Sequence, residues 1–450
     1  IKKYNKSMQH ILILGAGLSA SSLIQYLLAE SEIQDWQIRL GDLSVETAES
    51  KINKHPRGKA FFFDVNNEDQ CREEVKKANL VISMLPASLH FKVARACVDF
   101  GVNMLTASYV SPQIAALHEE AKAKGVLILN EIGVDPGIDH MSAMQVIDRI
   151  KSECGEIISF QSSTGGLVAP KYDNNPWNYK FTWNPRNVVV AGQGVSTFIR
   201  NGNYKYIPYH KLFKRILRTN VLNYGEFEIY PNRDSLKYRE IYGLKNIPSM
   251  FRGTMRRPGF SKSWDVFVQL GMTDDTFIIE DSENMTYREF VNSFLRYEPN
   301  IPVEAKLAKY MGIEEDSEIM YKLRWLDLFK PIQIGLKRAT PAQILQHILQ
   351  KKWVLDKDDK DMIVMQHRFE VSIGEHKKTI LSSMAVEGTD QIHTAMSKTV
   401  GYPIAIACKL ILTNQINDIG VILPIASSVY TPILKELATL GIEFIEEEIN

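Results

Sequence analysis

The sequence is poor in the residues that build disulfide frameworks and zinc sites. Its 450 residues include only four cysteines, which lie far apart and form no CxxC pair. This pattern is typical of reduced thiols in a cytosolic protein. The ten histidines show no HxxxH or HExxH spacing, so we expect no metal site.

The chain also lacks a net charge and a long apolar run. Its 53 lysines and arginines equal its 53 aspartates and glutamates, so no overall field attracts nucleic acid. No stretch approaches the ~20 uninterrupted apolar residues of a membrane-spanning helix. The polar segment 1–9 lacks the apolar centre of a signal peptide. We therefore expect a cytoplasmic protein with neither nucleic acid nor membrane as a partner.

The length exceeds what one hydrophobic core usually holds, so two or three domains are expected. Through residue 130, short apolar runs alternate with amphipathic segments. This rhythm predicts an α/β fold with a Rossmann-like, doubly wound parallel sheet, because parallel neighbours need crossover connections. The expected strands are 10–14, 37–41, 59–64, 79–85, 102–106 and 126–130, and the expected helices are 19–29, 68–77, 89–100 and 112–124.

The rhythm changes beyond residue 139, where a second, mixed sheet is expected. Thr286 and Thr340 have the neighbours of helix N-caps and indicate a helical block over 285–352. The other expected elements are a helix at 138–151, a long polar loop at 165–187, and strands at 157–164, 227–230, 361–371 and 378–386.

A glycine-rich pattern, GxGxxA, follows the first strand at residues 15–20. Gly15 permits a tight turn, Gly17 lets the backbone approach a pyrophosphate, and the small Ala20 lets the next helix pack on the strand. Leu18 and Ser19 complete the loop. Such a pattern can be an ordinary turn, but here it opens the first βαβ unit, which favours a dinucleotide site.

The second expected strand leads into Asp42. An acidic side chain at this position accepts hydrogen bonds from the adenosine ribose and repels a 2′-phosphate, which favours NAD over NADP. The alternative is that Asp42 is the N-cap of the next helix, a role that Ser44 could fill equally well.

Further candidate cofactor contacts lie where strands end, because the carboxyl ends of parallel strands border the cofactor crevice. The alternative is a buried strand followed by a turn, and both interpretations can hold together. The candidates are Asp64, Val65, Ser83, Leu85, Thr106, Ala107, Gly133 and Val134.

Several segments, in this order and spacing, closely resemble the glutamate-forming saccharopine dehydrogenase family. That family includes the fungal saccharopine reductase and the corresponding half of the animal bifunctional lysine-degrading enzyme. The likeness covers nearly the whole chain. Its segments are the glycine loop, ASYVSP at 107–112, NEIGVDPGIDH at 130–140, YPNRDS at 230–235 and RGTMR at 252–256, with 165–167, 175–183 and 398–403.

The resemblance implies an activity and an architecture. The activity is oxidation of saccharopine, with a nicotinamide cofactor and water, to glutamate and 2-aminoadipate semialdehyde in lysine metabolism. A homodimer is also predicted. The expected domains are a dinucleotide-binding domain at 1–132 with 400–450, a substrate-binding mixed α/β domain at 133–284 with 357–399, and a helical insertion at 285–356.

Two positions decide how far the family pattern carries over. Fungal members have an arginine after the second strand that suits NADP. The segment 41–44 here looks more like the NAD-using animal form, although NADP stays possible. The family often has a cysteine before the paired glycines, where this chain has Thr164, so an acid–base role for that cysteine cannot be carried over.

The substrate of the family explains why arginines are expected in the site. Saccharopine carries three carboxylates, and the planar guanidinium fork grips a carboxylate at two points. Arg233 and Arg256 are the candidates, with Thr254 beside them. An arginine is otherwise usually a solvated surface charge, which is the interpretation we keep for Arg257.

The oxidation removes hydride from the carbon next to a secondary amine and then adds water, so positioned acid–base groups are required. Asp135 in the Asp-Pro-Gly turn is the first candidate, although it could instead stabilise its own turn. Tyr109, with Ser108 before it, is the second, although it could be an ordinary half-buried tyrosine. His140 is interpreted as structural.

The sequence therefore predicts an NAD-linked saccharopine dehydrogenase. One alternative is a carboxynorspermidine-type imine reductase of the same fold. Another is a dinucleotide-binding sensor without catalysis, against which the presence of Asp135, Tyr109, Arg233 and Arg256 argues.

Overall fold

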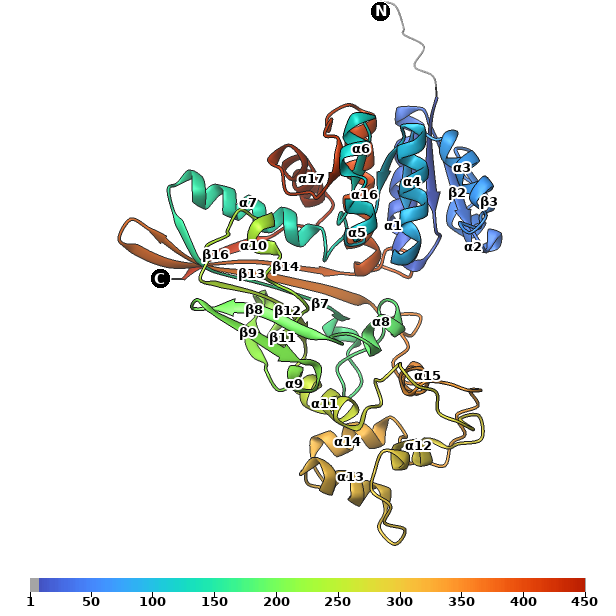
Figure 1. Ribbon diagram of the computed structural model, residues 1–450, viewed down its shortest axis with the longest axis vertical. Helices are drawn as coiled ribbons and strands as arrows, with labels where there is room; N and C mark the ends of the chain where they lie inside the picture. The colour runs from blue at the N-terminus through green and yellow to red at the C-terminus, as the bar shows by residue number, and fades with distance from the viewer. Residues whose placement is uncertain (1–7, 450) are drawn as a thin grey trace, which may run out of the picture. The chain divides into compact units, whose positions relative to one another are not determined.

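The structure, a computed structural model, describes residues 8–449 of the chain (Figure 1). Residues 1–7, on which the signal-peptide expectation rests in part, lie outside the described residues. The chain divides into two compact units. Unit 1 lies within Ile1–Gly155 and Val386–Phe444, and unit 2 within Glu156–Ala385 and Ile445–Asn450.

Unit 1 contains a seven-stranded sheet in the order β15-β6-β5-β4-β1-β2-β3. Every neighbouring pair is parallel, so the predicted Rossmann-like, doubly wound sheet is confirmed. The four residues 11–14 of β1 are fully buried because helices cover both faces of the sheet. The strands are β1 (Gln9–Leu14), β2 (Trp36–Asp42), β3 (Gly58–Phe62), β4 (Leu80–Ser83), β5 (Asn103–Leu105), β6 (Leu127–Leu129) and β15 (Gly420–Ile422).

The helices of unit 1 that were predicted from the sequence begin close to the expected residues. The expected helix at 112–124 is instead two short ones, divided at residues 116–117. The helices are η1 (Leu18–Ala20), α1 (Ser21–Gln34), α2 (Val45–Ile52), α3 (Glu68–Lys76), η2 (Ala87–Leu89), α4 (His90–Phe100), α5 (Pro112–Ala115), α6 (His118–Ala123), α7 (Ile138–Ser152), α16 (Ala395–Leu412) and α17 (Ser427–Thr439).

Helix α16 packs closely on α1 within unit 1. A Cβ added to Gly401 would lie 2.7 Å from the backbone nitrogen of Leu23, so only glycine permits this approach. By length and composition α16 could cross a membrane, but 72% of it is buried, which is typical of a core helix.

Unit 2 contains a nine-stranded mixed sheet, with the path β10-β11-β12-β7-β13-β14-β16 and the β8–β9 hairpin attached to β12. The strands are β7 (Glu156–Val168), β8 (Val195–Arg200), β9 (Asn203–Pro208), β10 (Leu217–Asn220), β11 (Glu226–Pro231), β12 (Ser249–Arg256), β13 (Asp361–Ile373), β14 (His376–Glu387) and β16 (Ile445–Ile449).

Strand β7 runs through residues that the sequence analysis expected to begin a loop. Gly165 suggests a turn, but it serves a close strand approach, since an added Cβ would lie 2.8 Å from the carbonyl oxygen of Met255. The loop therefore begins only after Val168, and it contains η3 (Pro170–Tyr172) and α8 (Pro185–Val189).

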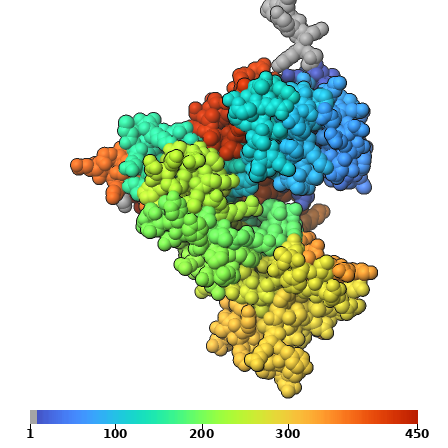
Figure 2. Space-filling model, viewed as in Figure 1, coloured from blue at the N-terminus to red at the C-terminus, as the bar shows by residue number. Residues whose placement is uncertain are grey.

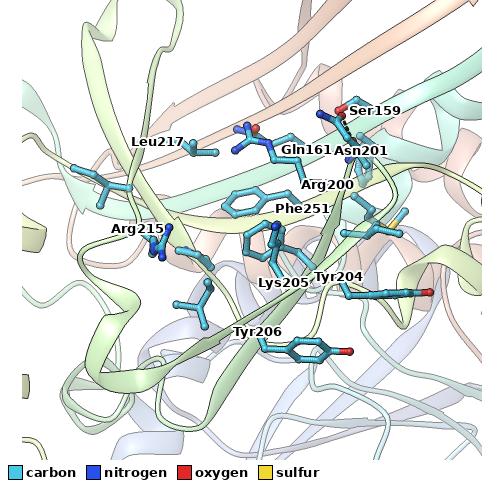
Figure 3. A pocket seen from close by; sticks show the side chains of 18 of the residues that line it. Ser159, Gln161, Arg200, Asn201, Tyr204, Lys205, Tyr206, Arg215, Leu217 and Phe251 are labelled. Atoms are coloured by element: carbon cyan, nitrogen blue, oxygen red, sulfur yellow. Dashed lines mark hydrogen bonds between the residues drawn. The ribbon is translucent and has the colours of Figure 1, made fainter.

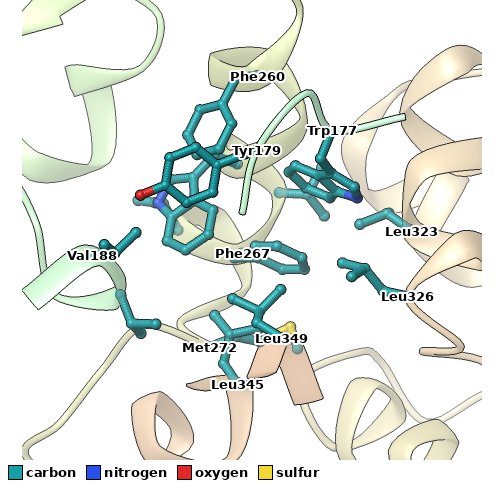
Figure 4. Close-up of a cluster of buried hydrophobic side chains, with 14 of the residues drawn as sticks. Trp177, Tyr179, Val188, Phe260, Phe267, Met272, Leu323, Leu326, Leu345 and Leu349 are labelled. Atoms are coloured by element: carbon teal, nitrogen blue, oxygen red, sulfur yellow. The ribbon is translucent and has the colours of Figure 1, made fainter. Parts of the chain in front are cut away.

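The helical block of unit 2 shares its hydrophobic core with the mixed sheet. Trp177, Phe267 and Leu349 belong to one buried cluster with sheet residues such as Ile229 (Figure 4). Figure 2 shows the block in yellow and orange, continuous with the green part of unit 2. The helices of unit 2 include α9 (Tyr209–Leu212), α10 (Tyr238–Ile241), α11 (Phe260–Leu270), α12 (Tyr287–Ser293), α13 (Val303–Met311), α14 (Glu318–Trp325) and α15 (Pro341–Gln350).

Both predicted N-caps of this block are confirmed. Thr286 and Glu289 form a capping box at α12, and Thr340 and Gln343 form one at α15.

The unit boundaries differ from the domain boundaries expected from the sequence. Residues 133–155 belong to unit 1, because α7 packs on α17. Residues 386–399 also belong to unit 1, and 445–450 belong to unit 2, where β16 pairs with β14. The helical block at 285–356 is part of unit 2 and forms no separate unit.

Candidate active site

The glycine loop of unit 1 has the geometry that a dinucleotide requires. Gly15 has φ of +103°, and an added Cβ would lie 2.8 Å from the carbonyl oxygen of Met84. No heavy atom lies within 4 Å of a Cβ added to Gly17. Space is therefore open in front of the loop, where a pyrophosphate would approach the start of η1. Leu18 is exposed, Ser19 is half-buried and Ala20 is buried against the sheet.

Asp42 holds this loop from the end of β2. Its Oδ2 accepts a hydrogen bond from the backbone nitrogen of Ala16 at 2.7 Å, and its Oδ1 accepts one from Ser44 at 2.9 Å. Ser44, not Asp42, is the N-cap of α2, since its side chain accepts from the nitrogen of Thr47. The N-cap alternative for Asp42 is therefore wrong, and the carboxylate lies beside the glycine loop, as a ribose contact requires.

Of the predicted cofactor contacts after β3 and β4, one makes a polar contact and two pack on the hydrophobic core. The Asp64 carboxylate accepts from the nitrogen of Asn66 at 2.9 Å. The Val65 side chain lies in the core, against which Leu85 also packs. Their contact with a cofactor stays a prediction.

A buried polar cluster joins the ends of β4 and β5. His90 Nδ1 lies 2.8 Å from Ser83 Oγ, and His90 Nε2 lies 2.7 Å from Ser108 Oγ and 3.3 Å from Thr106 Oγ1. Burial lowers the pKa of His90 to about 4. The sequence analysis missed His90, although its place at the start of a helix seven residues after a strand-end serine was a usable signal.

The two predicted acid–base residues lie together in unit 1. The Tyr109 hydroxyl donates to Asp135 Oδ1 at 3.4 Å, and both side chains are half-buried. Two further hydrogen bonds hold the turn of residues 133–139. Asp139 Oδ1 accepts from the nitrogen of Gly137 at 2.6 Å, and Gly133 donates to the carbonyl oxygen of Pro136 at 2.9 Å.

A buried contact between Glu131 and His140 fixes the neighbouring backbone. Glu131 Oε2 lies 2.8 Å from Nε2 of His140, and both side chains are buried. Glu131 also donates its backbone nitrogen to the carbonyl oxygen of Ser108 at 3.1 Å and accepts from the nitrogen of Val110 at 3.1 Å. His140 is therefore structural, as predicted. Glu131, which the sequence analysis overlooked, connects α7 to residues 108–110.

In unit 2, β12 carries two of the predicted substrate residues. Arg256 is 4% exposed, and its guanidinium lies 4.9 Å from the Tyr179 ring centroid and 5.4 Å from that of Phe260. It donates to the carbonyl oxygen of Met255. Among the described residues, no carboxylate forms an ion pair with Arg256. A buried cation of this kind suits a substrate carboxylate.

Thr254 and Thr164 are neighbours on the same sheet. They lie opposite one another in the β12–β7 pairing, and the Thr164 hydroxyl is buried without a hydrogen-bond partner among residues 8–449. Arg233, the third predicted substrate residue, follows β11 with φ of +45°, and its carbonyl oxygen accepts from Thr197 at 2.9 Å.

Comparison with known proteins decides the family. The description "Saccharopine dehydrogenase NADP binding domain" matches residues 11–129, and "Saccharopine dehydrogenase C-terminal domain" matches residues 133–442. The chain belongs to the saccharopine dehydrogenase family. Its N-terminal part is accordingly a nicotinamide-dinucleotide domain, and the glycine loop fits that assignment.

Relatives within the family match over almost the full length. Saccharopine dehydrogenase [NADP(+), L-glutamate-forming] of Schizosaccharomyces pombe is 32% identical over 98% of this chain and all of its own. Rat mitochondrial alpha-aminoadipic semialdehyde synthase is 31% identical over 96% of this chain, which spans 47% of the rat protein. The apo saccharopine dehydrogenase structure from Saccharomyces cerevisiae superposes with a TM-score of 0.89, at 28% identity over 98% of this chain and all of that one.

Two features of unit 2 lie outside the family motifs. Arg257 was interpreted as a surface charge, and this is wrong. Its guanidinium donates to the carbonyl oxygen of Tyr224 at 2.7 Å and lies 4.3 Å from the Phe227 ring centroid.

The other feature is a hollow of about 740 Å³ bordered by β7, β9 and β12 (Figure 3). Phe251 lies among its lining residues. Its lining residues do not include Thr254, Arg256 or Arg233.

Proposed function

We propose that this protein oxidises saccharopine, with a nicotinamide cofactor and water, to L-glutamate and 2-aminoadipate 6-semialdehyde. The observation that carries the proposal is the Tyr109–Asp135 pair, placed after β5 and β6 in the same unit as the glycine loop. The near full-length similarity to a protein named for this reaction supports it.

The residues of unit 1 supply binding and proton transfer. When bound, the cofactor accepts hydride from the carbon next to the secondary amine of the substrate. Gly15 and Gly17 would hold the pyrophosphate, and Asp42 would hold the ribose. Asp135 removes the proton of the amine, and Tyr109 orients the Asp135 carboxylate through its hydroxyl. The proton that Asp135 takes from the amine passes to solvent, as the one proton that the reaction releases. The Asp135 carboxylate then accepts a proton from the water that adds to the oxidised carbon and passes it to the nitrogen, and the carbon–nitrogen bond breaks to give the semialdehyde and the amino group of glutamate.

The residues of unit 2 supply charge for the substrate. Saccharopine has three carboxylates, and Arg233 and Arg256 would each bind one, with Thr254 as a hydroxyl donor. The Arg256 guanidinium is buried on aromatic rings and has no carboxylate partner among the described residues. This burial would make a bound carboxylate interact strongly.

The cofactor that we propose is NAD. The Asp42 carboxylate lies beside the glycine loop, and residues 42–50 contain no lysine or arginine to pair with a 2′-phosphate. NADP is the second candidate, because the matching domain description and the fungal relatives are named for it. The variant Asp42→Asn keeps one acceptor oxygen for the loop and removes the charge. It should therefore narrow the preference for NAD over NADP.

The test is an absorbance assay at the nicotinamide band with saccharopine as the substrate. We expect reduced cofactor to accumulate, with a higher kcat/KM for NAD than for NADP. Carboxynorspermidine as the better substrate would favour the imine-reductase alternative, and absence of turnover with both would favour a binding sensor. A wide preference of the wild-type protein for NADP would contradict the ribose role of Asp42. The homodimer and the cytoplasmic location stay predictions, and sedimentation tests the first.

A further inference from the structure

The hydrogen-bonded cluster around His90 crosses from β4 to β5. Ser83 is the last residue of β4, and Ser108 follows β5. His90 is 1% exposed and lies between them, 2.8 Å from Ser83 Oγ and 2.7 Å from Ser108 Oγ. One imidazole therefore joins a predicted cofactor contact to a predicted substrate contact.

We propose that His90 is a positioning residue that fixes the Ser108 hydroxyl, and with it the segment carrying Tyr109, in the arrangement that binds the substrate. The inference rests on the proposed function and deepens it, since Ser108 and Tyr109 belong to the proposed saccharopine site.

The two nitrogens of a neutral imidazole have different roles in hydrogen bonds. One ring nitrogen donates and the other accepts. In the tautomer that the proposal requires, the hydrogen of the ring is on Nε2, so the Ser83 hydroxyl donates to Nδ1 and Nε2 donates to Ser108 Oγ. Ser108 then keeps its own hydroxyl hydrogen for a substrate carboxylate, which can only accept. Thr106 Oγ1, at 3.3 Å from Nε2, lies on the same side of the ring.

The backbone of Ser108 is fixed separately from its side chain. Its carbonyl oxygen accepts from the nitrogen of Glu131 at 3.1 Å and from Nδ2 of Asn130 at 3.4 Å. A serine hydroxyl can still rotate about χ1 when its backbone is held. The contact with His90 restricts this rotation and so holds the Ser108 hydroxyl where it can donate to the substrate carboxylate. The backbone hydrogen bonds do not have this effect.

Two substitutions of similar size separate the two ring nitrogens. The amide nitrogen of His90→Gln can occupy the place of Nε2 and keep the bond to Ser108. That of His90→Asn can reach only the place of Nδ1, so the bond to Ser108 is lost. We expect His90→Gln to retain the wild-type KM for saccharopine. His90→Asn should raise this KM roughly tenfold, since a buried neutral partner is lost, and leave the cofactor KM unchanged.

A double-mutant cycle gives a readout that a purely structural role would not change. Ser108→Ala should raise the saccharopine KM in the wild-type and His90→Gln backgrounds, and should add little in His90→Asn. If His90→Asn does not fold, His90→Ala takes its place in the cycle, because alanine also lacks a donor at the place of Nε2.

Four results are decisive. Equal saccharopine KM values for His90→Gln and His90→Asn would overturn the inference, and so would additive effects of His90→Asn and Ser108→Ala on this KM. A hundredfold loss of kcat in both variants, with a changed pH profile, would make His90 an acid–base group instead. If Ser108→Ala and Tyr109→Phe both leave the saccharopine KM unchanged, the proposed site itself is wrong.

Discussion

At the scale of single residues, the site separates the carboxylate that braces the turn from the one that faces the acid–base partner. Asp139 accepts the backbone hydrogen of Gly137, while Asp135 lies 3.4 Å from the Tyr109 hydroxyl. The sequence predicted both Asp135 and Tyr109 from their motif. It could not show that Asp139 takes over the bracing role, because this depends on the fold of the turn.

The variant Asp135→Asn tests this division of roles. Asparagine keeps the shape of the side chain but cannot take the amine proton, so kcat should fall by about 10²–10⁴. Cofactor affinity and Tm should hardly change. Asp139→Asn is the control and should lower Tm more than kcat. Near-wild-type turnover of Asp135→Asn would contradict the acid–base assignment.

Burial of His90 predicts a pH dependence of stability. Its pKa is lowered to about 4 by desolvation, while an unfolded chain titrates near the ordinary value of about 6.5. Between these values only the unfolded chain binds the proton. The free energy of unfolding should therefore be fully retained above about pH 6.5 and fall by up to about 3 kcal/mol as the pH drops to about 4.

Denaturant titrations of the wild-type protein and His90→Gln across this range measure the effect. Glutamine does not titrate, so the difference in unfolding free energy between the two should change in the direction just given. A pH-independent difference would mean that His90 is protonated or accessible in the folded protein.

At the scale of elements, one glycine near α1 leaves room for a ligand, and another allows a helix to pack closely. Gly17 faces open space at the start of η1, whereas Gly401 in α16 lets the backbone of α1 approach closely. Gly17→Ala should leave Tm unchanged and weaken cofactor binding by about tenfold or more, because the methyl group meets the pyrophosphate. Gly401→Ala should lower Tm, although alanine favours helices.

Calorimetry and cofactor titration of both variants measure these effects. Equal losses of Tm in the two variants would contradict the distinction between them.

Arg256, the last residue of β12, and Arg257, which follows it, offer a matched pair. Arg256→Ala removes the buried guanidinium proposed for a substrate carboxylate, so the saccharopine KM should rise by some tens- to several-hundredfold. Arg257→Ala removes a bond to a backbone carbonyl and the contact with Phe227. It should lower stability and leave this KM near the wild-type value. Equal saccharopine KM values in both variants would place Arg256 outside the site.

The elements also show where sequence patterns fail. Six of the seven strands of unit 1 lie within or close to the apolar runs that predicted them, whereas β15, with only three residues, was not predicted. Strand β7 contains paired glycines that resemble a turn, but Gly165 is required by the approach of β12. The β8–β9 hairpin was missed because β9 begins with four exposed residues, Asn203 to Tyr206, and so lacks an apolar run.

At the scale of the whole molecule, the fold class and the two kinds of sheet followed from the sequence, but the boundaries did not. The chain returns to unit 1 after β14 and again to unit 2 with β16. Such returns depend on pairing between distant segments, which no local pattern encodes. The helical block looked separate because its caps are strong, yet its apolar faces complete the core of unit 2.

The central claim is that the protein oxidises saccharopine, releases glutamate and reduces a nicotinamide cofactor. The most direct test incubates the protein with saccharopine and NAD and measures glutamate and reduced cofactor in the same sample. The account predicts equal amounts of both, and at least about a hundredfold less of each with Asp135→Asn over the same time. Reduced cofactor without glutamate, or no product from the wild-type protein with either NAD or NADP, would contradict it.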